Sequence, residues 1–390
     1  MAHKILIDGR FIGVGDSIGR VVFGIIEHLL EIDKENSYSL LIRPAGVKQV
    51  REHGLWDSDR VKIEVQDFGH YSLSEQTKFL IWLNKKPYDL VYFTQFNHPI
   101  LYRKPYIIIV HDLTMFGYFS YENPLKVAMF KKVMKSAIFD SKKVVVDSGA
   151  TKDDILDNYQ LADKEKIKVI YLGVDANYLR ISKMDQADRI KLGNRFKNHY
   201  SLESEYLLYT GMWKKHKNLF RLLQAFRQVN SVSGIQLVMA GKVDKDEMEI
   251  IAEIEEINGH SIEKPIITDP VFITGFVPEE LLPAAYAGAL AYIQPSLSEG
   301  FGLPPLEAMA CGAPVVAAKI SATPEVLGDA AQYFDPENVE DMAMKIEEVI
   351  MNQRLREGLR KKGLERVKLY SWPENAKKTL KIIDDVLKKG

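Results

Sequence analysis

The feature that most constrains the fold is an alternation of short apolar runs with amphipathic helical stretches, which occurs twice along the chain. The first series begins with "KILID" and a helical pattern at positions 18, 21, 22, 25 and 29, and it continues through "SYSLLI", "DLVYFT", "YIIIV" and "KVVVDS". Strands buried on both faces of a parallel sheet form such continuous apolar runs. The pattern therefore predicts an α/β fold built on a doubly wound parallel sheet.

The pattern restarts after a polar, charged stretch at about 181–203, with "EYLLYT", "IQLVMAG", "VFITG", "ALAYIQP" and "PVVAA". A chain of 390 residues is longer than most single cores grow, so two domains are expected. We predict two Rossmann-like, doubly wound domains over residues 1–183 and 184–365. We also predict a C-terminal helix over 366–390 that crosses back to the first domain. Ligands of such sheets bind beyond the carboxyl ends of the strands. We expect the carboxyl ends of the two sheets to face each other across a cleft.

Composition excludes several classes of function. The 52 basic and 53 acidic residues give no overall attraction to nucleic acid. The single cysteine, Cys311, excludes an internal disulfide and a cysteine-built zinc site, and it fits a reducing cytoplasm. The start of the chain has no secretory pattern, and the apolar runs are shorter than the roughly 18 to 20 residues of a membrane span. We expect a cytoplasmic protein whose membrane contact, if any, is peripheral.

The segment "PSLSEGFGLPPLEAMACGAPVV", which begins at Pro295, carries the clearest chemistry. It predicts a strand end, a turn and a helix that opens with prolines, which are tolerated at the first helical positions. Gly300 and Gly302 let the backbone approach a ligand, and the N–H groups of the turn favour a phosphate. Glu299 at the turn and Glu307 one helical turn later could each accept hydroxyl hydrogens. Two carboxylates around a phosphate pocket suit a sugar nucleotide.

Two other interpretations of this pair stay open from the residues alone. Both glutamates could be solvated, with the glycines forming only a turn. The pair could also be the acid and nucleophile of a glycosidase, but those carboxyl groups must flank one bond. One carboxylate in a loop and one inside a helix do not suit that arrangement.

The same residues, "SEGFGLPPLEAMACGAPVVA", resemble the E-x7-E signature of retaining glycosyltransferases of family 4, which have the two-domain GT-B architecture. Other similar segments follow in order along most of the chain: "IDGRFIGVGDSIGR", "VHDL", "VDSGATKDDI", "VIYLGVD", "LLYTGMWKKHKNLFRLLQAF", "VMAGK" and "FITGFVPEEL". The similarity is greatest to bacterial mannosyltransferases that extend O-antigen and related polysaccharides. The resemblance implies that Glu299 holds hydroxyls of the donor sugar and that Glu307 binds the ribose. The residues implied to face the sugar and diphosphate are Gly300, Phe301, Gly302 and Leu303.

A basic stretch, "GMWKKHKNLF", precedes a helix with a core-facing apolar stripe, for which Asn218 is the predicted N-cap. Lys217 would then add a cation to a helix N-terminus, a combination that suits a diphosphate. A solvated lysine is the alternative. Many family members have an arginine at the position of Met212 and a second basic residue at the position of His216. Lys215 or His216 could therefore supply the second cation.

Further candidates lie at other strand ends. "YIIIVHDL" places His111 at the carboxyl end of a buried strand, and the resemblance implies that it lies beside the donor sugar and the reaction centre. Considered alone, a strand-end histidine is more often structural. Gly15 and Gly19 could bring backbone N–H groups to the leaving phosphate or the acceptor. The backbone near Phe276 and Val277 is expected to meet the nucleobase.

Other functional classes were weighed against the transferase. Gly13, Gly15 and Gly19 loosely match a dinucleotide fingerprint, and Arg43 could hold a 2′-phosphate, which would indicate an NAD(P)-dependent oxidoreductase or epimerase. The glycine spacing is off by one, however. A catalytically silent sugar-nucleotide-binding protein is a further alternative, since Met212 replaces the usual arginine.

A lysine-rich helical stretch could lie against an anionic membrane that carries a lipid-linked acceptor. A solvated helix face packed on its own sheet is the other interpretation. The lysines are Lys126, Lys131, Lys132, Lys135, Lys142 and Lys143.

Together the residues and the resemblance predict a retaining glycosyltransferase with His111, Lys217 and Glu299 at the reaction centre. It would move a hexosyl unit, with mannosyl from GDP-mannose favoured, to a growing glycan or a lipid-linked saccharide. Neither a metal ion nor a separate cofactor is expected, because preorganised charges would stabilise the leaving diphosphate. We expect a cytoplasmic location, with any membrane contact on the inner face.

Overall fold

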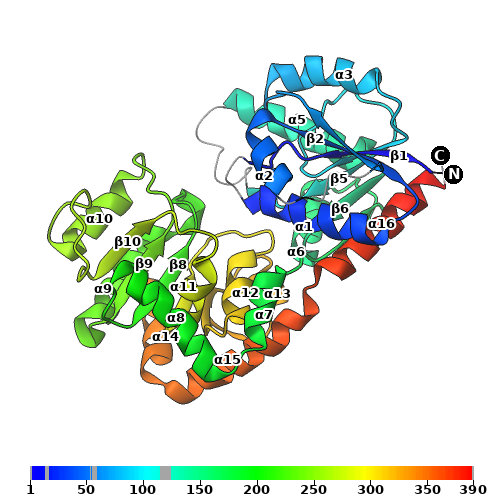
Figure 1. Ribbon diagram of the computed structural model, residues 1–390. Coiled ribbons are helices and arrows are strands. Elements are labelled where there is room, and N and C mark those ends of the chain that lie inside the picture. The colour runs from blue at the N-terminus through cyan, green and yellow to red at the C-terminus, as the bar shows by residue number, and fades with distance from the viewer. Residues whose placement is uncertain (1, 14–16, 53, 55–58, 115–123, 389–390) are drawn as a thin grey trace. The chain divides into compact units, whose positions relative to one another are not determined.

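The strands of the computed structural model form two parallel sheets, each covered by helices (Figure 1). The structure describes residues 2–13, 17–52, 54, 59–114 and 124–388. Contacts divide the chain into unit 1, Met1–Gly173 with Ser371–Gly390, and unit 2, Val174–Tyr370. The boundaries predicted from the sequence, after residues 183 and 365, differ from these by ten and five residues.

Unit 1 contains a seven-stranded sheet with the order β3-β2-β1-β4-β5-β6-β7. Ile5 pairs in parallel with Tyr38 on one side and with Leu90 on the other, so the strand order reverses at β1. The strands are β1 (Lys4–Asp8), β2 (Ser37–Ile42), β3 (Val61–Val65), β4 (Leu90–Phe93), β5 (Tyr106–Val110), β6 (Lys143–Val146) and β7 (Ile167–Val169). The main helices are α1 (Ser17–Ile32), α2 (Val47–Glu52), α3 (Leu80–Asn84), α5 (Pro124–Asp140), α6 (Gly149–Asn158) and α16 (Trp372–Leu387).

Unit 2 contains a six-stranded parallel sheet with the order β10-β9-β8-β11-β12-β13, which reverses at β8. The strands are β8 (Tyr206–Thr210), β9 (Gln236–Ala240), β10 (Val271–Gly275), β11 (Ala291–Gln294), β12 (Val315–Ala318) and β13 (Ala331–Phe334). The helices are α7 (Ala176–Ser182), α8 (Gln186–Tyr200), α9 (Leu219–Ser233), α10 (Met248–Asn258), α11 (Leu282–Gly288), α12 (Leu303–Ala310), α13 (Thr323–Leu327), α14 (Val339–Met351) and α15 (Gln353–Arg366). The predicted pair of doubly wound α/β sheets is confirmed.

The C-terminal helix α16 packs along α1 within unit 1 (Figure 1). Trp372, its first residue, is buried against two glycines. A Cβ atom on Gly24 would lie 2.4 Å from Trp372 Cε2, and one on Gly173 would lie 2.2 Å from Trp372 N. Asn375 adds a hydrogen bond from Nδ2 to the carbonyl oxygen of Tyr171, at 2.9 Å. The absence of side chains at the two glycines therefore allows the helix to dock.

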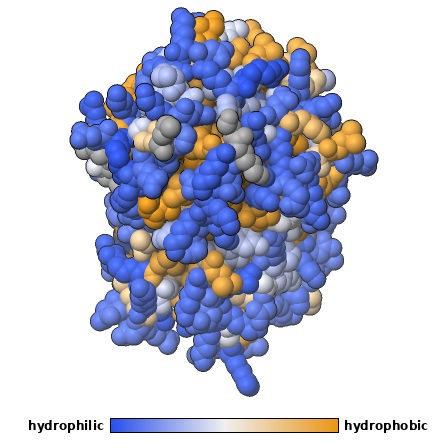
Figure 2. All heavy atoms as spheres, turned by 90° about the vertical axis from the view of Figure 1, so that its right-hand side faces the viewer, coloured by the Kyte–Doolittle hydropathy of each residue, from blue (hydrophilic) through white to orange (hydrophobic). Residues whose placement is uncertain are grey.

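The face of the molecule drawn in Figure 2 is mainly hydrophilic, and its hydrophobic residues form separate groups. Scattered apolar side chains are normal on a protein surface. Within the described ranges, no helix combines the length and hydropathy needed to cross a membrane.

Candidate functional site

The two glutamates lie beyond the carboxyl end of β11, which neighbours β8 at the point where the strand order of unit 2 reverses. Ligands of open α/β sheets bind at this position. The turn from Glu299 ends at Gly302, whose φ of +87° is in the left-handed region that favours glycine. Helix α12 begins at the next residue, Leu303, and contains Glu307. The structure thus places the segment from Glu299 to Glu307 as the sequence predicts.

One carboxylate oxygen of Glu299 receives three hydrogen bonds. The donors to Oε1 are Lys217 Nζ at 2.7 Å, Ser296 Oγ at 2.7 Å and Gln294 Nε2 at 2.5 Å. The second oxygen, Oε2, accepts no hydrogen bond from the described residues. Since the side chain is 14% exposed, this oxygen can accept a hydroxyl hydrogen from a ligand.

The charge state of Glu299 follows from these contacts. Burial raises the pKa of its carboxyl group, but the positive charge and hydrogen bond of Lys217, together with the hydrogen bond of Ser296, lower it further than burial raises it. The net pKa of Glu299 is below its usual value. The group is therefore ionised at neutral pH, and it is a weak base and a weak nucleophile.

Lys217 is the last residue of a short 3₁₀ helix, Lys215–Lys217, and its side chain is 21% exposed. An ammonium group has three N–H donors, so the bond to Glu299 leaves others for an anionic ligand. Asn218 follows with a left-handed backbone, φ +57°. Its Nδ2 donates to the carbonyl oxygens of Pro295 and Pro336 at 3.1 and 2.8 Å.

The predicted N-cap at Asn218 is wrong. An N-cap residue has an extended backbone and accepts from an N–H group of the first helical turn. The left-handed backbone of Asn218 does not fit that role, and its Oδ1 accepts from the Arg221 guanidinium at 3.0 Å. The side chain instead ties the loop after β11 to the start of α9.

The neighbouring basic residues have different environments. Burial lowers the pKa of His216 to about 4, assisted by the charge of Lys217, so the ring is neutral near pH 7 and supplies no cation there. Lys214 pairs with Asp244 at 2.8 Å. Lys215 is exposed, as is Met212, and it remains the candidate for the second cation.

Glu307 is 3% exposed on α12 and accepts a hydrogen bond at 3.0 Å from the hydroxyl of Tyr286 on α11. The sequence analysis missed Tyr286, and it also missed Gln294 and Ser296 beside Glu299. Polar residues that end a buried strand, as in "YIQPS", are a signal that could have pointed to Gln294 and Ser296. Tyr286 gives no such signal, because tyrosines are common in the core.

The segment expected to meet the nucleobase follows β10. Gly275 ends this strand with φ +66°, Phe276 is 82% exposed and Val277 is buried. Gly241 N donates to the carbonyl oxygen of Gly275 at 2.9 Å. A Cβ atom on Gly241 would lie 2.0 Å from the carbonyl oxygen of Gly211. Glycines therefore permit the ends of β8, β9 and β10 to approach one another closely.

In unit 1, His111 follows β5 and its ring is held at both nitrogens. Nδ1 lies 2.5 Å from Asp147 Oδ2, and Nε2 lies 3.0 Å from the carbonyl oxygen of Thr94. Both partners accept hydrogen bonds, so both nitrogens must donate, which requires the imidazolium form. Burial lowers the pKa of His111, but the Asp147 carboxylate raises it by more, so the net pKa is raised.

The other candidates in unit 1 lie near β1 and β2. Gly15 is outside the described residues. Gly19 lies in the first turn of α1, where a Cβ atom would be 2.9 Å from the carbonyl oxygen of Phe11. Arg43 Nη2 forms an ion pair with Asp67 at 2.9 Å, so its guanidinium already has an anionic partner.

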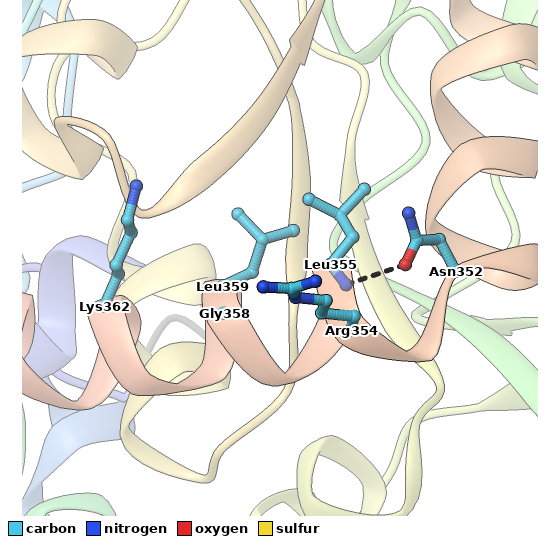
Figure 3. A pocket seen from close by; sticks show the side chains of 6 residues that line it. All are labelled: Asn352, Arg354, Leu355, Gly358, Leu359 and Lys362. Carbon is cyan, nitrogen blue, oxygen red and sulfur yellow. Dashed lines mark hydrogen bonds between the residues drawn. The ribbon is translucent and has the colours of Figure 1, made fainter.

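A hollow of about 300 Å³ occurs elsewhere in unit 2, on α15 (Figure 3). The residues that line it follow α15 from its N-cap, Asn352, to Lys362, and Asn352 Oδ1 accepts from Leu355 N at 3.0 Å. The predicted site residues do not line it. Across the described ranges, no group of three or more His, Cys, Asp or Glu residues is arranged to hold a metal ion.

Comparison with known families agrees with this arrangement. A model described as glycosyl transferases group 1 matches residues 192–366, and a model described as Glycosyltransferase Family 4 matches residues 40–178. The chain belongs to the glycosyltransferases. The two matches include the positions of His111, Lys217, Glu299 and Glu307 in this glycosyltransferase.

Curated relatives of this glycosyltransferase include two mannosyltransferases of Escherichia coli. O-antigen chain mannosyltransferase B is 27% identical over 275 residues, which are 69% of this chain and 68% of the relative. The serotype-specific mannosyltransferase WbdA is 32% identical over 192 residues, 49% of this chain but 22% of that longer protein. Among solved structures, Anabaena Alr3699/HepE in complex with UDP and glucose has a TM-score of 0.74 and 16% identity, with 98% of this chain and 100% of that chain covered. The GT-B fold predicted for this glycosyltransferase is thus confirmed.

Proposed function

We propose that this glycosyltransferase transfers a hexosyl unit from a nucleotide sugar to a growing glycan or lipid-linked saccharide, with retention of the anomeric configuration. A mannosyl unit from GDP-mannose is favoured, because the relatives reported above are named mannosyltransferases. The observation that carries the proposal is Glu299, with Oε1 held by three donors, Oε2 open and Lys217 beside it.

Each side chain has a part in binding the donor. Glu299 Oε2 accepts a hydroxyl of the transferred sugar, and Glu307 accepts hydroxyls of the ribose. The remaining N–H donors of Lys217 bind the diphosphate, assisted by the backbone N–H groups that precede α12. The exposed backbone after Gly275 is left for the nucleobase.

The reaction breaks the bond between the anomeric carbon and the phosphate oxygen. The electron pair stays on the departing diphosphate, which Lys217 stabilises. The acceptor hydroxyl oxygen attacks the same face of the sugar, and its proton passes to a donor phosphate oxygen. Glu299 does not serve as the nucleophile, because Lys217 and the Ser296 hydroxyl lower the pKa of its carboxyl group and so its basicity. His111 has both nitrogens occupied, and its imidazolium contributes positive charge rather than a base.

The dinucleotide-dependent oxidoreductase is not favoured. Arg43, the residue that would hold a 2′-phosphate, is paired with Asp67, and the family matches cover both halves of the chain.

A thermal-shift screen of GDP, UDP, ADP and dTDP sugars, followed by product analysis with the best donor, tests the proposal. We expect stabilisation by a GDP-sugar and an α-linked product from an α-linked donor. Binding without release of nucleotide, in the presence of saccharide acceptors, would instead indicate a silent sugar-nucleotide-binding protein. An inverted product would refute retention.

We further propose a peripheral contact of α5 with an anionic membrane. Leu125 and Met129 on this helix are 74% and 41% exposed, and the lysines at 126, 131, 132 and 135 are exposed beside them. Basic residues flanking exposed apolar ones suit an interfacial helix. Co-sedimentation should occur with vesicles of phosphatidylglycerol and not with vesicles of phosphatidylcholine; equal behaviour with both would contradict the contact.

A further inference from the structure

A continuous set of hydrogen-bonded side chains connects the two glutamates within unit 2. Gln294 donates to Glu299, and the Tyr292 hydroxyl donates to Gln294 Oε1 at 3.1 Å. Thr210 Oγ1 lies 3.2 Å from the Tyr292 hydroxyl and 3.1 Å from the Tyr286 hydroxyl. Tyr286 in turn donates to Glu307 at 3.0 Å. These residues come from β8, α11, β11, α12 and the loop that follows β11.

The hydrogen bonds fix the direction of the Gln294 amide. Its Oε1 accepts from Tyr292, and its Nε2 donates to Glu299 Oε1 and to Ser296 Oγ. An amide rotated by half a turn would place its oxygen against the Glu299 carboxylate, which cannot donate when ionised. Tyr292 therefore selects the amide orientation that donates to Glu299.

At the centre of this hydrogen-bonded set, two tyrosine oxygens share one hydroxyl hydrogen. Tyr292 has one hydroxyl hydrogen, and Gln294 Oε1 at 3.1 Å is a closer acceptor for it than the Thr210 carbonyl oxygen at 3.5 Å, while Tyr286 directs its own hydrogen to Glu307. Thr210 then has one hydrogen for two tyrosine oxygens, so it donates to one of them at a time. A hydroxyl that receives a hydrogen bond becomes a stronger donor, so the choice made by Thr210 reaches both carboxylates.

We propose that Gln294 and Tyr292 are positioning residues that keep Glu299 Oε2 directed toward the donor sugar, and that Thr210 and Tyr286 extend the same support to Glu307. This inference rests on the proposed function, because it takes Glu299 and Glu307 as the residues that bind the donor. Neither Gln294 nor Tyr292 touches the reacting atoms in this scheme. They act through the orientation of Glu299.

The test uses the full chain with Gln294→Met, Tyr292→Phe and the combined variant. In each, kcat and KM are measured with GDP-mannose, or with the best donor of the screen, and the Kd of the free nucleoside diphosphate is measured by calorimetry. Tyr206→Phe is the matched control, because Tyr206, like Tyr292, is a fully buried tyrosine on a strand of this sheet. Its hydroxyl donates instead to the carbonyl oxygen of Ala285, at 2.7 Å.

We expect Gln294→Met to lower kcat by about tenfold or more, since small displacements of a catalytic group have effects of this order. Tyr292→Phe should lower kcat by roughly threefold or more. The nucleoside diphosphate Kd should stay within about twofold in both variants, because the free nucleotide lacks the sugar that Glu299 holds. Once Gln294 is replaced, loss of the Tyr292 hydroxyl should have no further effect on kcat.

Several results would overturn the inference. One such result is an effect of Tyr292→Phe on kcat no larger than that of Tyr206→Phe. Another is that Tyr292→Phe lowers kcat by the same factor with and without Gln294, which would mean that Tyr292 does not act through Gln294. A nucleotide Kd that changes as much as kcat would indicate general damage to the fold. A wild-type chain that transfers no sugar from any donor would refute the proposed function itself, and the inference with it.

Discussion

The ion pair between Lys217 and Glu299 leads to opposite predictions for its two members. Their atoms Nζ and Oε1 lie 2.7 Å apart, so Glu299 partly cancels the charge that Lys217 offers to a diphosphate. A full cation about 4 Å from a phosphate charge contributes about 4 kcal/mol at the effective dielectric of a protein surface. If Glu299 cancels half of this attraction, removing Glu299 strengthens binding by about 2 kcal/mol, or about 30-fold in Kd. Removing Lys217 loses its full contribution of about 4 kcal/mol, or roughly a thousandfold in Kd.

We therefore expect Lys217→Met to weaken the binding of free GDP by up to about a thousandfold and Glu299→Gln to strengthen it by up to about 30-fold. Both variants should lower kcat, Lys217→Met by roughly a hundredfold or more, as for other single groups that stabilise a developing anion. Isothermal titration calorimetry with GDP, or with the nucleotide of the best donor, measures the first effect. Lys345→Met is the control, because Lys345 pairs with Glu348 at 3.0 Å on α14. If both site variants weakened GDP binding equally, Lys217 would serve only to hold Glu299, and its assignment to the diphosphate would be refuted.

Three further predictions concern other parts of the chain. Glu307→Ala should raise the nucleoside diphosphate Kd by about tenfold to a hundredfold through loss of ribose hydrogen bonds, and an unchanged calorimetric Kd would remove Glu307 from that role. Gly24→Ala should destabilise unit 1 by about 1 to 3 kcal/mol, because its Cβ would lie 2.4 Å from Trp372, and an unaltered thermal midpoint of the transition followed by Trp372 fluorescence would contradict this. Because the pKa of His111 is raised in the folded protein, its protonated form stabilises the fold at pH values below the unfolded pKa of about 6.5. This stabilisation is lost as the pH rises through the folded pKa. Asp147→Asn should lower the His111 pKa in an NMR titration. An unchanged His111 pKa would show that Asp147 does not raise it.

Much of the fold and part of the candidate site could be predicted because their signals are local. The apolar runs "YIIIV" and "ALAYIQP" became β5 and β11, since strands buried on both faces need continuous apolar residues. The turn at Gly302 could also be predicted from local residues, because glycine permits a left-handed backbone and proline is tolerated at the first helical positions.

The missed features depend on contacts between residues far apart in the sequence. Lys217 and Glu299 are 82 positions apart, and Thr210 and Tyr286 are 76 apart, so no local pattern indicates that they meet. The neutral state of His216 follows from burial beside Lys217, which the basic run "WKKHK" does not reveal. The place of Asn218 before a helix predicts a cap, whereas its side chain donates to the carbonyl oxygens of Pro295 and Pro336, which are 77 and 118 positions away.

The packing of α16 on α1 has a consequence for synthesis of the protein. Residues 371–390 are translated after the whole of unit 2, yet they belong to the unit that contains the first strand. Unit 2 is translated completely before α16 can cover the apolar face of α1, so the nascent chain must keep that face from aggregating until α16 has been made.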